Sequence, residues 1–167
     1  MRINGIAHIV LTVNRPELAV PFYERLFGFL EFKTAFRHER GAYFIGGKTA
    51  VAIVPSEPPH DEAAFEQTRV GMHHLCFRAY AREDVDRLYS HLLEMGAKIV
   101  HPPEEGQWAP GYYSVLFEDP DGIRLELNFV PGKGLLADDA RFNPVGYDVR
   151  TSPISRRADI FGFALGQ

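Results

Sequence analysis

The sequence predicts an α+β fold built from two tandem βαβββ modules. A segment of the form glycine, two residues, histidine and an apolar run occurs at residues 5–11 and again at residues 71–77. Each copy is followed by an amphipathic helical stretch and then by three extended runs. The chain has 167 residues, 46% of them hydrophobic, and each half alone would have a thin core. One compact body is therefore expected.

The first module, residues 3–55, begins with a strand predicted at residues 6–13. A helix follows at residues 16–27, because Leu18, Phe22 and Leu26 recur about one turn apart, and Gly28 is its expected end. Three further strands complete the module, at residues 29–36, 42–45 and 50–54.

The second module, residues 70–131, repeats this order. Its strand from residue 74 precedes a helix at residues 82–95, which is closed by Gly96. Three more strands are predicted, at residues 98–101, 112–117 and 124–130. A linker rich in proline and acidic residues, 56–69, joins the modules into a single domain of residues 1–131. Residues 132–167 form a C-terminal extension for which no role is predicted.

Composition excludes several classes of function. The net charge is −4, and no cluster of Lys and Arg marks a nucleic-acid surface. No apolar run approaches the roughly 20 residues of a membrane span, and the N-terminus lacks a signal segment. One cysteine, Cys76, allows no internal disulfide. We therefore expect a cytoplasmic protein with a small-molecule substrate and neither nucleic acid nor membrane as a partner.

Strand alternation places three polar residues on faces that the helices do not cover. In the last predicted strand, Leu125 and Leu127 pack under a helix and Glu126 faces away. His8 and His74 hold the same position in the two copies. A lone histidine there is more often structural than a ligand, and a strand glutamate is usually solvated. The duplication of the histidine nevertheless suggests a shared metal.

Four segments together form a specific pattern, although each one alone is weak evidence for a family. They are GIAHIVL at 5–11, FYERLFGF at 22–29, HHLCFR at 73–78 and FEDPDGIRLEL at 117–127. Through them, residues 3–131 resemble the vicinal oxygen chelate superfamily. This superfamily includes glyoxalase I, methylmalonyl-CoA epimerase, fosfomycin-resistance enzymes, bleomycin-resistance proteins and extradiol dioxygenases.

The resemblance implies the glyoxalase/dioxygenase fold, in which the two modules form one open, U-shaped, barrel-like groove around one divalent metal ion. It places His8, His74 and Glu126 at that ion, which would be Fe, Zn, Ni, Mn or Co. Two neutral imidazoles and one carboxylate leave coordination positions open for a substrate with adjacent oxygens. His73 is expected to turn away from the ion by alternation. The resemblance also implies a homodimer.

The chain departs from each familiar subfamily. Glyoxalase I carries a fourth ligand on the last strand of the first module, where this chain offers only Ala50 or Ala52. Extradiol dioxygenases place a tyrosine ten residues before the glutamate, and that position is Leu116. Ser114 matches a serine of the fosfomycin-resistance pocket, but the nearby tyrosine of that pocket again falls at Leu116. Bleomycin-resistance proteins lack metal ligands altogether.

Three further residues are candidates for the catalytic role. Arg78 and Arg124 share the ligand face and could bind an anionic substrate, although an ordinary ion pair is at least as good an interpretation. Tyr113 lies in an aromatic loop that could form one side of a substrate pocket, or that could only pack against the rest of the protein.

The sequence thus favours a divalent-metal-dependent enzyme acting on a small molecule, with extradiol-type oxygenase chemistry slightly preferred because the triad leaves positions open. A glyoxalase-like lyase or isomerase, or a thiol transferase of the fosfomycin-resistance type, is the alternative. A drug- or metabolite-binding protein of the bleomycin-resistance type is a further alternative.

Overall fold

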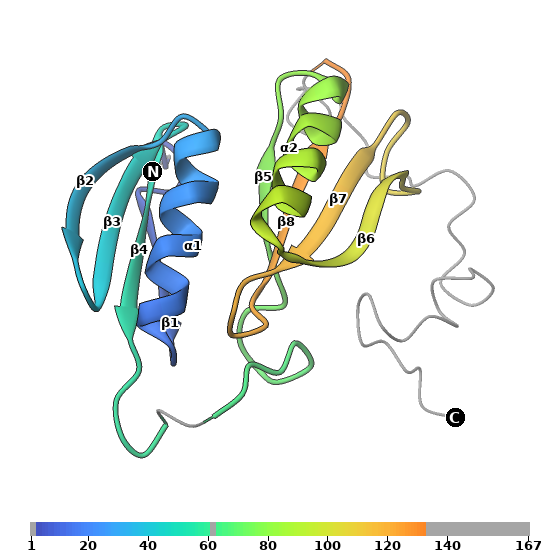
Figure 1. Cartoon of the computed structure of the whole chain (residues 1–167). Helices are drawn as coiled ribbons and strands as arrows, with labels where there is room; N and C mark the ends of the chain where they lie inside the picture. The colour runs from blue at the N-terminus through green and yellow to red at the C-terminus, as the bar shows by residue number, and fades with distance from the viewer. Residues whose placement is uncertain (1–2, 61–62, 133–167) are drawn as a thin grey trace, which may run out of the picture. The chain divides into compact units, whose positions relative to one another are not determined.

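A computed structural model describes residues 3–60 and 63–132 and confirms the predicted order of elements (Figure 1). The first module contains β1 (His8–Val13), α1 (Pro16–Phe29), β2 (Lys33–His38), β3 (Gly41–Gly46) and β4 (Thr49–Pro55). The second contains β5 (Leu75–Arg78), α2 (Arg82–Met95), β6 (Lys98–Glu105), β7 (Tyr113–Glu118) and β8 (Arg124–Phe129). Both modules are βαβββ, so the α+β class is confirmed. The predicted C-terminal extension beyond residue 132 lies outside the described residues.

The chain divides into two compact units. Unit 1 contains the first module together with His91–Lys98 and Glu118–Ile123. Unit 2 contains Glu66–Ser90, Ile99–Phe117 and the described chain from Arg124 onward. The boundary after Phe65 falls inside the predicted linker. The end of α2 and the turn between β7 and β8 therefore belong to unit 1, although the sequence repeat places them in the second module.

Each module has a four-stranded sheet with the same strand order. The first sheet runs β1-β4-β3-β2 and the second runs β5-β8-β7-β6. The first strand of each module pairs in parallel with the last, with Val10 opposite Ala52 in one sheet and Cys76 opposite Glu126 in the other. Ala52 is therefore the first-module counterpart of Glu126.

The helix ends differ in how well the sequence predicts them. α2 ends at Met95, and Gly96 takes a φ of 68° while the Ala97 N–H donates to the carbonyl of Leu92, as expected for a glycine-closed helix. The prediction that Gly28 ends α1 is wrong. α1 continues to Phe29 and the left-handed residue is Glu31, with a φ of 61°. Because the helix runs on, β2 begins at Lys33 rather than at residue 29.

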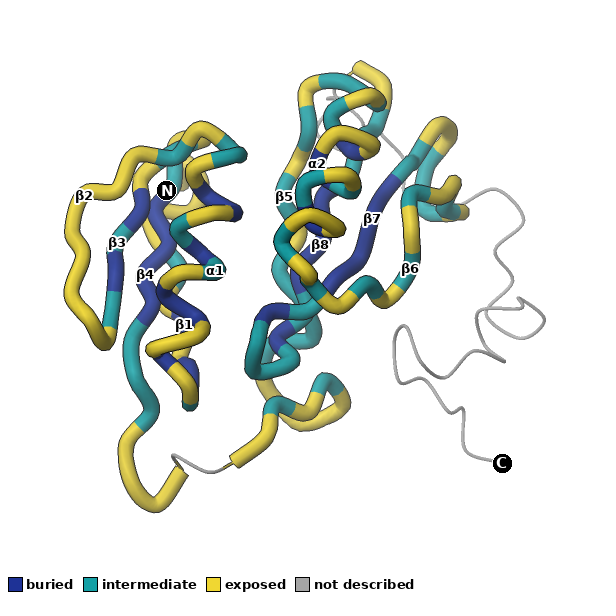
Figure 2. The backbone as a smooth tube through the Cα atoms, viewed as in Figure 1, coloured by how far each residue is buried: buried dark blue, intermediate teal, exposed yellow. Residues whose placement is uncertain are grey.

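The core of unit 1 is an aromatic cluster between α1 and one face of its sheet. Phe27 is fully buried, and its ring centroid lies 5.5 Å from that of Tyr23, 4.9 Å from Phe32 and 5.0 Å from Phe44. Figure 2 shows the buried stretches along α1, β3 and β4, whereas β2 is exposed along its whole length. The edge strand contributes little to this core.

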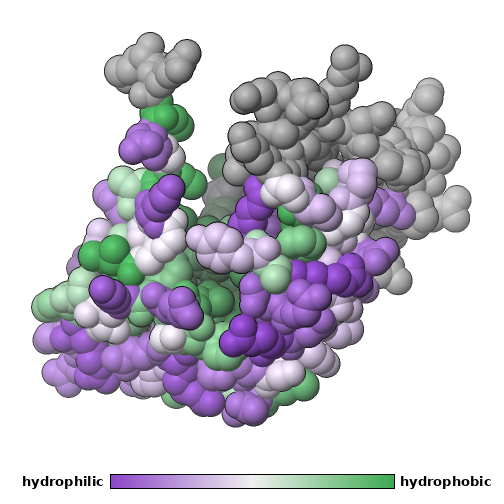
Figure 3. Space-filling model, turned by 90° about the horizontal axis from the view of Figure 1, so that it is seen from above, coloured by the Kyte–Doolittle hydropathy of each residue, from purple (hydrophilic) through white to green (hydrophobic). Residues whose placement is uncertain are grey.

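The opposite face of the first sheet carries exposed apolar side chains. Val10, Ala52, Tyr43 and Phe36 form one register row across its strands, and His8 lies in the next row beside Ala50. Val10 and Phe36 are 52% and 60% exposed. Figure 3, a view from above, shows hydrophobic residues at the surface among hydrophilic ones. We call the face of the first sheet that carries His8, Val10, Ala50, Ala52 and Phe36 the outer face of the first sheet.

The core of unit 2 is mainly aliphatic and lies between α2 and its sheet. Fully or nearly fully buried side chains come from the helix and from the two central strands: Val85, Leu88, Val115, Phe117, Leu125 and Leu127. The predicted inward face of β8 is thereby confirmed for its leucines. Among the described helices, none has the length and apolar character needed to cross a membrane.

A buried tyrosine–carboxylate bond ties α1 to the turn between β7 and β8. The hydroxyl of Tyr23 donates to Asp119 Oδ2 over 2.8 Å, and both residues are buried. Asp119 Oδ1 accepts the N–H groups of Asp121 and Ile123, which shapes the turn. Burial raises the pKa of Asp119 to about 6, because these hydrogen bonds only partly offset the loss of hydration.

This raised pKa predicts a pH-dependent stability term that Asp119→Asn removes. The carboxyl has a pKa of about 6 in the folded state and an ordinary pKa of 3.8 in the unfolded state. Its protonated form therefore stabilises the fold, an effect that is complete below pH 3.8 and is lost as the pH rises through 6. Between pH 4 and pH 7 the wild type should therefore lose about 2 kcal/mol of unfolding free energy relative to the variant. Denaturant unfolding of both proteins measures the difference; a difference that does not change with pH contradicts the assignment.

Candidate metal centre

Unit 2 brings His74 and Glu126 into contact. His74 lies immediately before β5, and Glu126 lies on the neighbouring strand β8. His74 Nε2 is 3.2 Å from Glu126 Oε2. Glu126 is 8% exposed, so the pair is largely removed from water. Two of the three residues expected at a metal thus lie within one hydrogen-bond length of each other.

The Glu126 carboxylate is held by three hydroxyl or imidazole neighbours. The hydroxyl of Tyr112 donates to Glu126 Oε1 over 2.5 Å, while Oε2 faces His74. Burial opposes ionisation of Glu126, but hydrogen bonds with His74, Tyr112 and Ser114 outweigh it and keep the pKa of the carboxyl below its ordinary value. Glu126 is therefore an anion at neutral pH, oriented through both of its oxygens.

The second ring nitrogen of His74 contacts His73. The two Nδ1 atoms are 2.7 Å apart, and the side-chain nitrogen of Gln67 lies 3.1 Å from the same Nδ1 of His73. His73 therefore contacts the ring nitrogen of His74 that does not face Glu126, and because β5 begins only at Leu75, strand alternation does not set its direction. Burial, followed by the nearby His74 and Arg124, lowers the pKa of His73, which keeps its ring neutral.

The facing atoms of His74 and Glu126 suit either a proton or a cation. At 3.2 Å, His74 Nε2 can donate to Glu126 Oε2 when the nitrogen carries its proton, and the same two atoms can bind an ion when it does not.

The pair fits one edge of a divalent-metal site. Metal–ligand bonds of about 2.0–2.2 Å to imidazole nitrogen and carboxylate oxygen place the two ligand atoms about 3 Å apart. Nitrogen and oxygen donors of this kind suit Zn, Fe, Ni, Co and Mn. Within residues 3–60 and 63–132, no three His, Cys, Asp or Glu side chains gather in a cluster that could hold a metal, so the described geometry supplies two ligands.

His8 belongs to unit 1, where it begins β1 on the outer face of the first sheet. It is exposed, and its register neighbour on β4 is Ala50. Because Ala50 and Ala52 follow the same face of β4, no carboxylate stands beside His8 on that strand. The sequence interpretation that a fourth ligand is missing from the first module agrees with this register.

The three predicted catalytic residues have other contacts. Arg78 donates to the backbone carbonyls of Val130 and Gly132 over 3.3 and 3.0 Å, which ties β5 to the end of the described chain. Arg124 is half-buried on β8 and near enough to His73 to lower its pKa, after burial and His74. Arg124 is therefore the arginine near the pair.

Tyr113 faces helix α2. Its hydroxyl donates to Asp86 over 2.7 Å, and the Arg82 guanidinium lies 3.6 Å above its ring. The hydrogen bond with Asp86 is the main cause of a raised pKa for this phenol. The tyrosine that reaches Glu126 is Tyr112. Alternation along the strand predicted at residues 112–117 puts the two tyrosines on opposite faces, with Tyr112 on the face of Ser114, so the sequence did carry a signal for Tyr112.

Two weakly acidic groups adjoin Glu126. Cys76 lies opposite it across the β5–β8 pair, and Tyr112 bonds to it. Reduced hydration, and after it the negative charge of Glu126, raises the pKa of both the thiol and the phenol. Although Cys76 keeps exposed surface, it is therefore a neutral thiol rather than a reactive thiolate.

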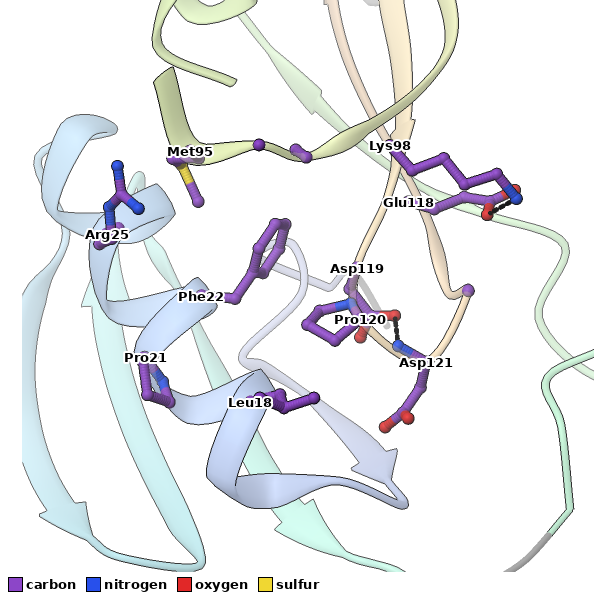
Figure 4. Close-up of a pocket in the computed structure, with 13 residues that line it drawn as sticks. Leu18, Pro21, Phe22, Arg25, Met95, Lys98, Glu118, Asp119, Pro120 and Asp121 are labelled. Atoms are coloured by element: carbon purple, nitrogen blue, oxygen red, sulfur yellow. Dashed lines mark hydrogen bonds and ion pairs between the residues drawn. The ribbon is translucent and has the colours of Figure 1, made fainter. Parts of the chain in front are cut away.

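A separate pocket of about 640 Å³ lies in unit 1 (Figure 4). Leu18 and Phe22 of α1, together with Met95 and Pro120, supply its apolar wall. Its acidic groups are engaged by neighbours: Glu118 with Lys98 at 2.7 Å, Asp119 with Tyr23 and Asp121 with Arg15. The pocket contains none of the three predicted metal ligands, so it offers no second centre of the same kind.

Comparison with known proteins agrees with this description. The sequence profile of the Glyoxalase/Bleomycin resistance protein/Dioxygenase superfamily matches residues 5–127. The metallothiol transferase FosB of Shouchella clausii is 32% identical over 126 residues, covering 75% of this chain and 80% of that protein. The crystal structure of a candidate glyoxalase from Bacillus halodurans is 31% identical with a TM-score of 0.68, covering 76% of this chain and 96% of that one.

A more distant structure shows the same fold. FosX, a fosfomycin resistance protein from Mesorhizobium loti, superposes with a TM-score of 0.59 at 22% identity, covering 81% of this chain and 100% of that one. The profile match spans both modules, including the segments that carry His8, His74 and Glu126. The chain therefore belongs to the glyoxalase/bleomycin resistance protein/dioxygenase superfamily.

Proposed function

We propose that this protein is a divalent-metal-dependent enzyme that transfers a thiol to a small electrophile with adjacent oxygen atoms. His8, His74 and Glu126 would hold the ion. A bound divalent ion supplies Lewis acidity, which stabilises negative charge developing on a substrate oxygen. The thiol sulfur would form a bond to carbon as a carbon–oxygen bond breaks, and the released oxygen would take up a proton.

The approach of His74 Nε2 to Glu126 Oε2 at 3.2 Å carries this proposal. His73 contacts the other ring nitrogen of His74 and Tyr112 donates to the other oxygen of Glu126, so the two facing atoms are the ones that could share an ion. An imidazole nitrogen and a carboxylate oxygen at this separation match one edge of a divalent-metal site. The repeat supports His8 as the third ligand, because His8 stands before the apolar run of the first module as His74 does in the second.

The side chains around the pair prepare it for binding. Tyr112 and Ser114 fix the rotation of the Glu126 carboxylate, so one oxygen remains for the ion. Within unit 1, His8 lies beside exposed apolar surface of the outer face of the first sheet, such as Val10. Arg124 is the nearest candidate to balance the charge of an anionic substrate.

The similar proteins favour thiol transfer over the other candidate reactions. The metallothiol transferase is 32% identical and covers three quarters of the chain. The slight preference for extradiol-type oxygenation has no support among these proteins, and Leu116, at the tyrosine position of those enzymes, is buried. A glyoxalase-like lyase is the second candidate, favoured by the 31% identical structure of a candidate glyoxalase.

Activity with defined substrates tests the proposal. The metal-reconstituted protein should consume fosfomycin together with L-cysteine or glutathione, and the product should contain a new carbon–sulfur bond by mass spectrometry. Turnover of methylglyoxal with glutathione instead would favour the lyase, and oxygen uptake with catechol would favour the oxygenase. Light scattering checks the expected homodimer. Stoichiometric ligand binding without any turnover would overturn the enzymatic assignment.

His74→Ala is expected to reduce metal affinity at least about tenfold while the protein stays folded. The substitution removes one ligand from a partly exposed position, where water can replace the ring. Competition with a chromogenic chelator measures the affinity, and circular dichroism checks the fold. His60→Ala, at an exposed position of the linker, is the matched control and should leave the affinity unchanged. Full retention of metal by His74→Ala would remove this residue from the site.

A further inference from the structure

We propose that Gly106 is a positioning residue of the candidate metal centre and acts through Tyr112. By carrying no side chain, Gly106 leaves the room in which the Tyr112 ring lies, so that the Tyr112 hydroxyl can hold the Glu126 carboxylate. The inference rests on the proposed metal centre and deepens it. The contacts that carry it lie within unit 2, in the connection between β6 and β7 and on β8.

The ring of Tyr112 packs directly against the backbone of Gly106. A Cβ atom added at Gly106 would lie 2.7 Å from Cδ1 and 3.1 Å from Cε1 of Tyr112, and 3.2 Å from Cδ1 of Trp108. Carbon atoms in ordinary contact are about 3.5–4.0 Å apart. Cδ1 is near the root of the tyrosine side chain, so the ring could not yield without moving its hydroxyl. A residue larger than glycine is therefore incompatible with this position of Tyr112.

The backbone of the connection fixes where the Tyr112 side chain begins. The Gly106 N–H donates to the Tyr112 carbonyl, and the Tyr112 N–H donates to the carbonyl of Ala109, both over 3.0 Å. Pro110 and Gly111 lie between the partners of the second bond, and Gly111 has a φ of 72°, as in a type II β-turn. Both backbone polar groups of Tyr112 are thus engaged, and a backbone shift that made room for a larger residue at 106 would have to break these bonds.

The other end of the Tyr112 side chain reaches a predicted ligand. Its hydroxyl donates to Glu126 Oε1 over 2.5 Å, while His74 faces Oε2. Hydrogen bonds to an ionised carboxylate are roughly twice as strong as those between neutral groups. Without this hydroxyl, Ser114 would be the remaining hydroxyl neighbour that holds the carboxylate. The space above Gly106 therefore controls the orientation of Glu126.

Carbon NMR of the metal-free protein reads the contact at Glu126 directly. With glutamate labelled with ¹³C at the side-chain carboxyl, the Glu126 resonance is the one that Glu126→Gln removes. Tyr112→Phe deletes the hydroxyl and should shift this resonance, and Gly106→Ala should shift it as well. Two matched variants should leave it in place. Tyr80→Phe deletes a hydroxyl at a 98% exposed position, and Gly28→Ala adds a Cβ that meets nothing within 4 Å.

Metal affinity supplies the second measurement. Tyr112→Phe should bind Zn²⁺ about 10- to 100-fold more weakly than the wild type, the usual effect of losing a partner that orients a ligand. Gly106→Ala should show a loss of similar size. Because Gly106 acts through the hydroxyl, the double variant Gly106→Ala/Tyr112→Phe should bind no more weakly than Tyr112→Phe alone. Circular dichroism checks that each variant is folded.

The outcomes separate this inference from the proposed function. An unmoved Glu126 resonance in Tyr112→Phe or in Gly106→Ala overturns it, and so does a moved resonance with unchanged Zn²⁺ affinity. Additive losses of affinity in the double variant would mean that Gly106 does not act through Tyr112. If His74→Ala retains full metal affinity, the metal centre itself fails, and the carbon NMR still decides whether Gly106 and Tyr112 position Glu126.

Discussion

Replacement of Glu126 by glutamine is expected to weaken divalent-metal binding at least about a hundredfold, or about 2.7 kcal/mol, and to leave the metal-free protein folded. The amide has nearly the shape of the carboxylate and can still accept the Tyr112 hydrogen bond. It lacks the negative charge. Its NH₂ group can also donate to His74 Nε2 when that nitrogen carries no proton, and so occupy the nitrogen that would bind the ion.

The same substitution at another glutamate is the control. Glu105 is exposed and pairs with Arg82 on the surface of unit 2. Glu105→Gln should therefore leave metal affinity unchanged, because exposed ion pairs contribute little and this one lies outside the predicted site. Isothermal titration of both variants with Zn²⁺ provides the comparison. Equal affinities for Glu126→Gln and the wild type would mean that the carboxylate has a structural role.

Phe27→Ala should lower the free energy of unfolding by about 3–5 kcal/mol. Its ring is fully buried and contacts three other rings, those of Tyr23, Phe32 and Phe44. Truncation removes this contact area and leaves a cavity where α1 packs on the sheet. A loss of this size is a large share of the 5–15 kcal/mol that stabilises ordinary domains.

Phe36→Ala is the matched variant for this experiment. Phe36 lies on β2 and is 60% exposed, so its removal should cost less than about 1 kcal/mol. Urea unfolding of the two variants, followed by circular dichroism, compares them. Similar losses in both would contradict the assignment of the unit 1 core to the aromatic cluster behind α1.

The fold was predictable because the sequence repeats. Each module reads as a strand, a helix and three strands, and the apolar spacing that predicts α2 at residues 82–95 matches its observed bounds. The error at Gly28 has a local cause. The helical hydrogen bonds of α1 continue past that glycine, and Leu30 N–H still donates to the carbonyl of Leu26, so the chain turns at Glu31. Sequence alone does not reveal which of several adjacent residues takes the left-handed conformation.

The candidate site was predictable only in part. Strand alternation singles out Glu126 and the repeat singles out His74, and the structure brings these two together. The residues behind His74, which are His73 and Gln67, lie in a loop or before a strand begins. Periodicity carries no information about side-chain direction in such segments. Their roles depend on contacts between parts of the chain that are distant in sequence.

The metal content of the purified protein tests the central claim most directly. Elemental analysis of protein prepared anaerobically and without chelators should find about one divalent ion per chain in the wild type. The single variants His8→Ala, His74→Ala and Glu126→Ala should each lose it. Absence of metal from the wild type even after reconstitution, or full occupancy in any of the three variants, would contradict a centre built from these residues.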